Sequence, residues 1–190
     1  MNPVPPSATL DGAAKALARG EAVIFPTDTV YGIGVAVGAA PGPEVLYAAK
    51  GRPASKPIPW LVASLGDLGR YGRDVPPYAR QLAREGWPGA LTLVVRASEA
   101  VPAAFCSAAG TVALRMPDHP VPLALAKAVG PLATTSANRS GQPPARCGAE
   151  VDPQLAAACG WVLAGDGSWP CAGVPSSIVD CTGPHPRPLR

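Results

Sequence analysis

Three cations stand close together in the first third of the chain, in a segment that cannot form a regular helix. Lys50, Arg52 and Lys56 fall within seven residues. Pro53 and Pro57 interrupt this segment, so the cations are held on a bent, extended stretch rather than around a helical face. Cations that converge on one spot repel one another unless an anion joins them, and a triphosphate meets that need. A solvated basic loop is the alternative.

A polar turn with several reactive side chains precedes the cations. The apolar run at 22–25 predicts a short buried strand. Thr27, Asp28, Thr29 and Tyr31 follow it directly, which places two hydroxyls, a carboxylate and a phenol at the end of a strand. Ligands often bind at this position in open α/β sheets. A turn stabilised by the aspartate would explain the same residues without a ligand.

A third candidate is an arginine at the exit of a predicted strand. Side chains alternate along a strand, so Thr111, Ala113 and Arg115 share one face. The Arg115 guanidinium could hold a carboxylate or a phosphate in a fork. A structural ion pair is the alternative, with Asp118 as the nearest candidate partner in the sequence.

A hydroxyl-rich turn at 134–141 follows another predicted strand. It contains Ser136, Asn138 and Gly141 among other small residues. Small side chains and a glycine permit close approach of the backbone to phosphate oxygens. An Asx turn without a ligand would have a similar sequence.

The bulk composition limits the classes of protein that fit. At 190 residues the chain is long enough for one domain with a core, and we expect a single domain over 1–190 with its core at about 9–183. The net charge of +3 suits an anionic ligand and falls short of the basic face of a dedicated nucleic-acid binder. No apolar run approaches the roughly 20 residues of a membrane span, so we expect a cytoplasmic protein without a membrane partner.

Helical and extended patterns take turns along the chain. Helices are predicted at 9–19, 43–50, 76–85, 120–129 and 151–158. Strands are predicted at 22–25, 58–63, 91–95, 111–114, 131–135, 161–164 and 177–180. This alternation favours an α/β fold in which helices pack on a sheet.

Six segments together resemble one known family. In order, they are FPTDTVYGIG (25–34), KGRPASKP (50–57), WPGALTLVV (87–95), TVALRMPDHP (111–120), TTSANRSGQPPA (134–145) and PSSIVDCTG (175–183). This set resembles the YrdC-like family, the threonylcarbamoyl-AMP synthases, from about residue 9 to the C-terminus. Each segment alone is a weak signal, whereas six in the family's order are specific.

The resemblance implies a fold and an activity. The fold is a twisted mixed α/β sheet with flanking helices around a positively charged cavity. The activity joins L-threonine, bicarbonate and ATP into L-threonylcarbamoyl-AMP and releases pyrophosphate, with Mg²⁺ on the triphosphate. The product supplies N6-threonylcarbamoyladenosine in tRNA through a downstream transferase machinery, and the resemblance leaves direct contact with tRNA open.

The resemblance also implies roles for individual residues. Those that would bind threonine are Thr29, Tyr31, Arg115 and Ser176. Those that would bind the nucleotide are Lys50, Arg52, Lys56, Thr111, Ser136, Asn138 and Arg190. Lys50, Arg52 and Lys56 would also offset its negative charge. Because Arg190 is the last residue given, a frayed end is the alternative for it.

The expected chemistry needs no protein nucleophile and no metal ligand from a side chain. The sequence has no G-x-x-x-x-G-K-[ST] loop and no serine or cysteine with a convincing histidine partner. His119 is expected in a helix-entry or packing role, with contact to the substrate as the alternative. A carbamate oxygen that attacks an α-phosphate requires positioning and cations. Two other functions stay open: a related carbamoyltransferase of another pathway that forms a carbamoyl-adenylate, and a non-catalytic RNA-binding module.

Overall fold

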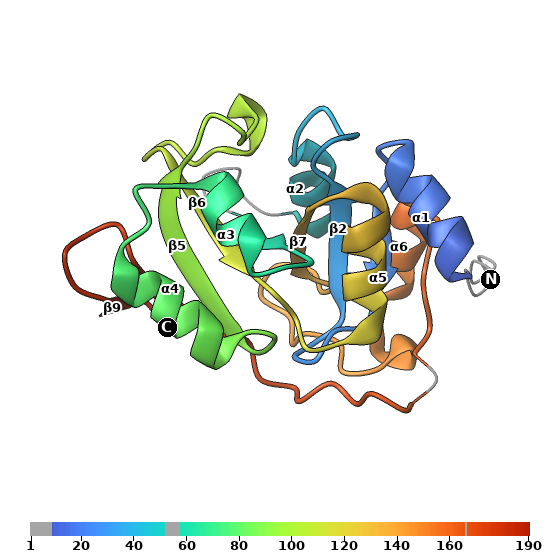
Figure 1. The fold of residues 1–190 in the computed structure, drawn as a ribbon. Coiled ribbons are helices and arrows are strands. Elements are labelled where there is room, and N and C mark those ends of the chain that lie inside the picture. Colours follow the sequence, from blue (N-terminus) through green and yellow to red (C-terminus); the bar gives the residue numbers. More distant parts are fainter. Residues whose placement is uncertain (1–8, 52–57, 166) are drawn as a thin grey trace.

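The fold is built on one mixed sheet, seen in a computed structural model that describes residues 9–51, 58–165 and 167–190. The strands run in the order β1-β2-β7-β3-β6-β5-β8-β9, and β4 pairs with β5 (Figure 1). Pairs β3/β6 and β5/β8 are parallel, whereas the other pairs are antiparallel. The strands are β1 (Val23–Phe25), β2 (Gly32–Ala36), β3 (Trp60–Leu61), β4 (Gly72–Arg73), β5 (Leu91–Ala97), β6 (Thr111–Arg115), β7 (Leu132–Ser136), β8 (Ser177–Asp180) and β9 (Arg187–Pro188).

Helices flank this sheet, so the expected mixed α/β fold is confirmed. Helices α1 and α5 pack together beside β2 and β7, and α4 lies along β5 (Figure 1). The helices are α1 (Leu10–Ala18), α2 (Glu44–Lys50), α3 (Gly66–Tyr71), α4 (Pro77–Gly86), α5 (Pro120–Val129) and α6 (Pro153–Cys159). Short 3₁₀ turns occur at Ala103–Phe105 and Gly148–Glu150.

Local signals account for where the helices begin. The Thr9 hydroxyl accepts from the backbone N–H of Gly12 and caps α1. Both α4 and α5 have a proline in the first turn, where no N–H partner is required. His119 Nδ1 accepts from the N–H of Val121 and caps α5, so the expected helix-entry role of this histidine is confirmed.

The core lies on both sides of the sheet and has an aromatic centre on one of them. The Trp60 ring is fully buried and meets Tyr71 edge to face at 5.4 Å and Phe105 at 6.1 Å between ring centroids. Each such pair contributes about 0.5–1.5 kcal/mol beyond its buried area. On the other side, Leu17 of α1 and Leu125 of α5 are fully buried in a second cluster. The strands that lead into the polar turns are therefore packed against buried side chains on both faces of the sheet.

The strand predictions differ from the structure at two places. No strand was predicted at Gly32–Ala36, but this segment is the buried strand β2. A Cβ on Gly32 would lie 2.8 Å from Thr134 Cγ2, so the close approach of β7, and not a turn, accounts for the glycine. Residues 161–164 were expected as a strand, but Val162 forms only an isolated bridge with Ile24.

The structure also gives one observation about membranes. Among the helices of the described ranges, none combines the length and apolarity required to cross a bilayer.

Candidate active site

The polar turn after β1 is organised by a threonine. Strands β1 and β2 pair antiparallel, so the turn is the loop of a hairpin. The Thr27 hydroxyl donates to the carbonyl of Val30 at 2.7 Å and accepts from the N–H of Thr29 at 3.1 Å. The turn is thus stabilised by Thr27, whereas the carboxylate of Asp28 accepts from a distant arginine.

That arginine is Arg115, at the end of β6. Its Nε donates to the carbonyl of Gly89, Nη1 to Thr29 Oγ1, both at 2.9 Å, and Nη2 to Asp28 Oδ1 at 2.6 Å. The expected partner Asp118 is wrong, because the ion pair is with Asp28. Arg115 is only 6% exposed. Burial lowers the pKa of the guanidinium, and the nearby Asp28 carboxylate opposes this shift.

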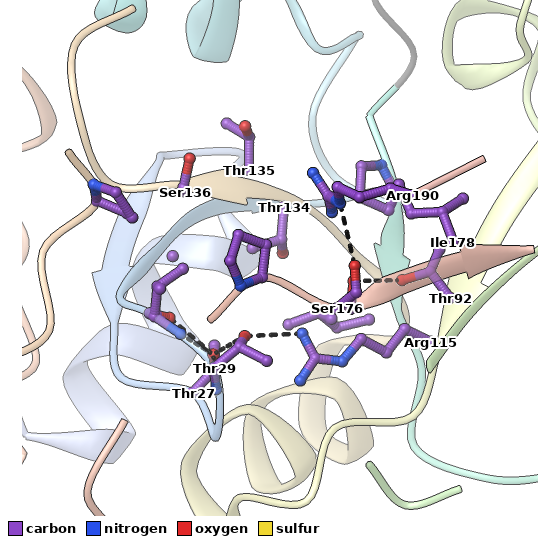
Figure 2. A pocket seen from close by; sticks show the side chains of 16 residues that line it. Thr27, Thr29, Thr92, Arg115, Thr134, Thr135, Ser136, Ser176, Ile178 and Arg190 are labelled. Carbon is purple, nitrogen blue, oxygen red and sulfur yellow. Dashed lines mark hydrogen bonds between the residues drawn. The ribbon is translucent and has the colours of Figure 1, made fainter. Parts of the chain in front are cut away.

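A cavity of about 320 Å³ opens beside this arginine (Figure 2). Its wall comes from several strands and from the segment before β8, and the close-up shows hydroxyl and guanidinium groups around it. The predicted site residues that it brings together are Thr29, Arg115, Ser136, Ser176 and Arg190. Other polar residues in its wall are Thr27, Thr92, Thr134 and Thr135.

Ser176 and Arg190 form the side of the cavity opposite the turn. The Ser176 hydroxyl lies 2.8 Å from that of Thr92, and Arg190 Nε donates to the carbonyl of Ser176 at 3.1 Å (Figure 2). Strand β9 pairs with β8 and carries the chain to this point. Arg190 therefore contributes to the wall of the cavity, and the frayed-end alternative does not describe it.

Lys50 is buried at the end of α2 and braces the turn after β7. Its ammonium donates to the carbonyl oxygen of Ser136, and to Asn138 at its carbonyl oxygen (2.7 Å) and at Oδ1 (2.9 Å). Only 4% of Lys50 is exposed. The structure thus brings Lys50, Ser136 and Asn138 together. The predicted cations Arg52 and Lys56 lie outside the described residues.

Tyr31 and Thr111 are not among the residues that line this cavity. The Tyr31 hydroxyl accepts from the N–H of Gly165 at 2.8 Å, and burial raises its pKa. The Thr111 hydroxyl lies 2.7 Å from that of Ser107. Thr111 lines a second hollow of about 550 Å³, whose wall also contains Leu189. Since Arg190 lines the first cavity, the end of the chain lies between the two hollows.

Sequence reasoning missed Thr92 and Gly89 as parts of the site. Both belong to the segment WPGALTLVV, which reads as a turn followed by an apolar strand. A single threonine among apolar strand residues is the only local sign of Thr92. It is 1% exposed, so its hydroxyl must be satisfied inside the protein.

Comparison with known proteins decides the family. The profile of the Sua5/YciO/YrdC domain, described as telomere recombination, matches residues 15–190. The chain belongs to the Sua5/YciO/YrdC family. This confirms the resemblance drawn from the six sequence segments.

Relatives of this Sua5/YciO/YrdC domain are similar over most of its length. A relative from Mycobacterium tuberculosis is 42% identical over 178 residues, which cover 94% of this chain and 81% of the relative. The threonylcarbamoyl-AMP synthases of Bacillus subtilis and Pyrococcus abyssi are each 36% identical over 94% of this chain. The chain spans about half the length of these two, 51% and 52%.

Solved structures give the same picture of the domain. P. abyssi Sua5 in complex with L-threonine has a TM-score of 0.88 and 35% identity, and the match covers 95% of this chain and 53% of that one. Full-length HypF in a phosphate- and nucleotide-bound form has a TM-score of 0.79 at 18% identity, covering 97% of this chain and 29% of that one. At that identity the likeness shows the fold alone.

Proposed function

We propose that this domain synthesises L-threonylcarbamoyl-AMP from L-threonine, bicarbonate and ATP and releases pyrophosphate. The observation that supports it most is the cavity whose wall contains buried Arg115, bonded to the Thr29 hydroxyl, together with Ser136, Ser176 and Arg190. Relatives named threonylcarbamoyl-AMP synthase, and the Sua5 structure in complex with L-threonine, support the same activity.

The amino acid occupies the Arg115 side of the cavity in this proposal. A guanidinium has five N–H donors, and three of those of Arg115 bind Gly89, Thr29 and Asp28. The remaining two, one on each terminal nitrogen, are available to the carboxylate of threonine. Tyr31 stabilises this side of the site, because its hydroxyl accepts a hydrogen bond from the N–H of Gly165.

The nucleotide occupies the other side. Lys50 holds the turn that contains Asn138 and presents Ser136 to the phosphates, and Arg190, after β9, reaches the nucleotide. Thr111 lies in the neighbouring hollow beside Leu189, where the rest of the nucleotide has room. Arg52 and Lys56 complete the charge on the triphosphate, as the sequence segment that contains them suggests.

Mg²⁺ accompanies ATP in this proposal and is held by phosphate oxygens. The ion prefers oxygen ligands, keeps several waters and commonly binds through substrate phosphates. Asp28, the carboxylate next to the cavity, is already bound by Arg115. The hydroxyls and cations of the described wall therefore fit a triphosphate that brings its own metal ion.

The reaction then proceeds without a protein nucleophile. The unprotonated threonine nitrogen forms a bond to the carbon of bicarbonate, and water leaves, which gives a carbamate. A carbamate oxygen attacks the α-phosphorus of ATP, the bond from that phosphorus to the bridging oxygen of the β-phosphate breaks, and pyrophosphate leaves. The protein contributes position, since the two reacting groups lie in one cavity, and cations that offset the developing charge.

The product is a mixed anhydride, which is an activated donor of the threonylcarbamoyl group. By the family resemblance, the acceptor is the N6 nitrogen of an adenosine in tRNA, and the transfer belongs to a downstream machinery. A carbamoyltransferase of another pathway is less well supported, because the similar relatives are named for the synthase and the HypF likeness shows the fold alone.

A pyrophosphate-release assay tests the proposal. Purified protein is incubated with ATP, Mg²⁺, bicarbonate and L-threonine, and each component is then omitted in turn. We expect pyrophosphate and a new adenylate only when all are present. Release that does not depend on threonine, or no release under any of these conditions, would reject the synthase activity.

The cation segment is tested separately by calorimetry. Arg52→Ala and Lys56→Ala should each weaken ATP binding at least tenfold, because each removes a charge-assisted contact to phosphate. Lys127→Ala, on the exposed face of α5, is the matched control. Unchanged ATP affinity in both loop variants would show that these cations do not hold the triphosphate.

A further inference from the structure

The hydrogen-bond direction at Thr29 is fixed by its neighbours. Thr27 Oγ1 lies 2.7 Å from the carbonyl oxygen of Val30, which can only accept, so the single hydroxyl hydrogen of Thr27 is used there. The Thr27 oxygen also accepts from the N–H groups of Thr29 and Val30, at 3.1 and 3.2 Å, so three donors share its two lone pairs. The Thr29 hydroxyl, 2.9 Å away, is the third of these donors, because the hydrogen of Thr27 is directed at Val30. Arg115 Nη1 can only donate, and it donates to Thr29 Oγ1. Thr29 therefore has one lone pair left and can only accept a bond from a ligand.

Ser176 has the opposite role to Thr29, since its hydroxyl accepts from a protein neighbour and can donate to a ligand. The hydroxyls of Thr92 and Ser176 lie 2.8 Å apart, and Thr92 is 1% exposed. Within the described part of the chain, Ser176 Oγ is the hydrogen-bonding neighbour found for the Thr92 hydroxyl. If Ser176 donated instead, Thr92 would hold a buried donor without an acceptor, which is strongly disfavoured. Thr92 therefore donates, and the Ser176 hydrogen is available to the cavity.

We propose that Thr27 and Thr92 are positioning residues that give the cavity two hydroxyls of opposite and fixed polarity, an acceptor at Thr29 and a donor at Ser176. Both hydroxyls face the same cavity, on opposite sides of it (Figure 2). The ligand must then offer an anion to Arg115, an N–H donor to Thr29 beside it, and an oxygen acceptor to Ser176.

This pattern matches a β-hydroxy-α-amino acid, and it rests on the proposed function. The α-nitrogen is one carbon away from the carboxyl carbon, so a carboxylate on Arg115 brings an N–H group towards Thr29, which Arg115 itself contacts. The side-chain oxygen, one carbon further along, accepts from Ser176. Valine has the shape of threonine but presents a methyl group to Ser176, which leaves this polar group unpaired. Thr92 therefore helps to select threonine through the Ser176 hydroxyl that it orients.

Calorimetry with L-threonine and L-valine tests the role of Thr92. Wild-type protein should prefer threonine by about a hundredfold or more. Thr92→Val should weaken threonine binding about tenfold and leave valine binding within about twofold, and Thr92→Ser should restore the preference. Thr9→Val, which removes the cap of α1, is the matched control that loses a hydroxyl outside the cavity wall.

A double-mutant cycle separates positioning from general damage. Ser176→Ala should abolish most of the preference for threonine, and Thr92→Val in that background should change threonine affinity by no more than about twofold. The double variant should have a higher melting temperature than Ser176→Ala alone, because Thr92→Val removes a buried hydroxyl that has lost its acceptor. Additive losses in affinity, or equal losses for threonine and valine in Thr92→Val, would overturn the proposal.

A third ligand tests the acceptor at Thr29. 3-Hydroxy-2-methylbutanoate carries a methyl group in place of the α-amine and offers no donor there. Thr29→Val should lower the preference for threonine over this analogue about tenfold, and an unchanged preference would overturn the assignment. Failure of the proposed function is distinguishable, since wild-type protein would then bind no threonine and release no pyrophosphate, whatever the variants do.

Discussion

The guanidinium of Arg115 and the carboxylate of Asp28 form an ion pair at 2.6 Å, although 87 residues separate them in the chain. The pair joins the end of β6 to the hairpin turn after β1. It is largely buried, with side-chain exposures of 7% for Arg115 and 16% for Asp28. The geometry of the amino-acid side of the cavity therefore depends on a contact between two strands that do not pair directly.

Removing Asp28 should reveal this dependence. Asp28→Ala should lower the free energy of unfolding by about 3 kcal/mol, because it leaves a buried guanidinium without its counter-charge. Asp28→Asn keeps an acceptor oxygen and should have a smaller effect. Denaturant unfolding measures both, and Asp11→Ala, which breaks an exposed ion pair with Lys15, is the control that should change little. Equal stability of wild type and Asp28→Ala would contradict the structural role of the pair.

Lys50 should order the turn after β7 from within the protein. Lys50→Met preserves the length of the side chain but removes the donors that bind Ser136 and Asn138. We expect a loss of about 2 kcal/mol in the free energy of unfolding and faster amide hydrogen exchange over residues 136–142. Lys127→Met on the exposed face of α5 should change neither quantity. Unaltered exchange in the turn would mean that Lys50 does not hold it.

Asp180, at the end of β8, should make the stability of the protein depend on pH in the acidic range. Burial alone would raise the pKa of this carboxyl, but bonds from Thr182 and Arg187 outweigh it, so its pKa is lowered. A folded pKa below the unfolded value of about 3.9 stabilises the protein above that pH, and this stability is lost as pH falls through the folded pKa.

The stability difference between wild type and Asp180→Asn should accordingly be largest at neutral pH and shrink below about pH 4. Denaturant unfolding between pH 3 and pH 7 measures it. A difference that stays constant across this range would show that the carboxylate of Asp180 does not carry the stability.

The cysteines should differ widely in reactivity. Burial raises the pKa of Cys159 to about 12 and, with the Asp180 charge, that of Cys181 to about 11, whereas Cys147 is exposed. The thiolate is the reactive form, so an alkylating agent at pH 8 should modify Cys147 first. Mass spectrometry of the native protein should find Cys159 and Cys181 unmodified until the protein is denatured. Rapid native alkylation of Cys159 would contradict its burial.

Local sequence signals predicted most of the helices. The cap at Thr9 and the prolines in the first turns of α4 and α5 act within one helical turn, so they are visible in the sequence. Strand β8 was predicted at the observed residues. Strand β2 was not, since its glycines accommodate Thr134 on a neighbouring strand about a hundred residues away, and a local rule cannot detect that contact.

Six segments in the family's order were enough to indicate the family and the residue types that such a cavity needs. Which of those residues meet depends on the tertiary structure. Antiparallel pairing of β1 with β2 forms the hairpin whose turn holds Asp28 and Thr29, and the fold brings that turn to Arg115. Parallel pairing of β5 with β8 brings Thr92 against Ser176. Hydrogen-bond direction depends on every neighbour of a hydroxyl, and those neighbours are distant in sequence, so the polarity of the site follows from the fold.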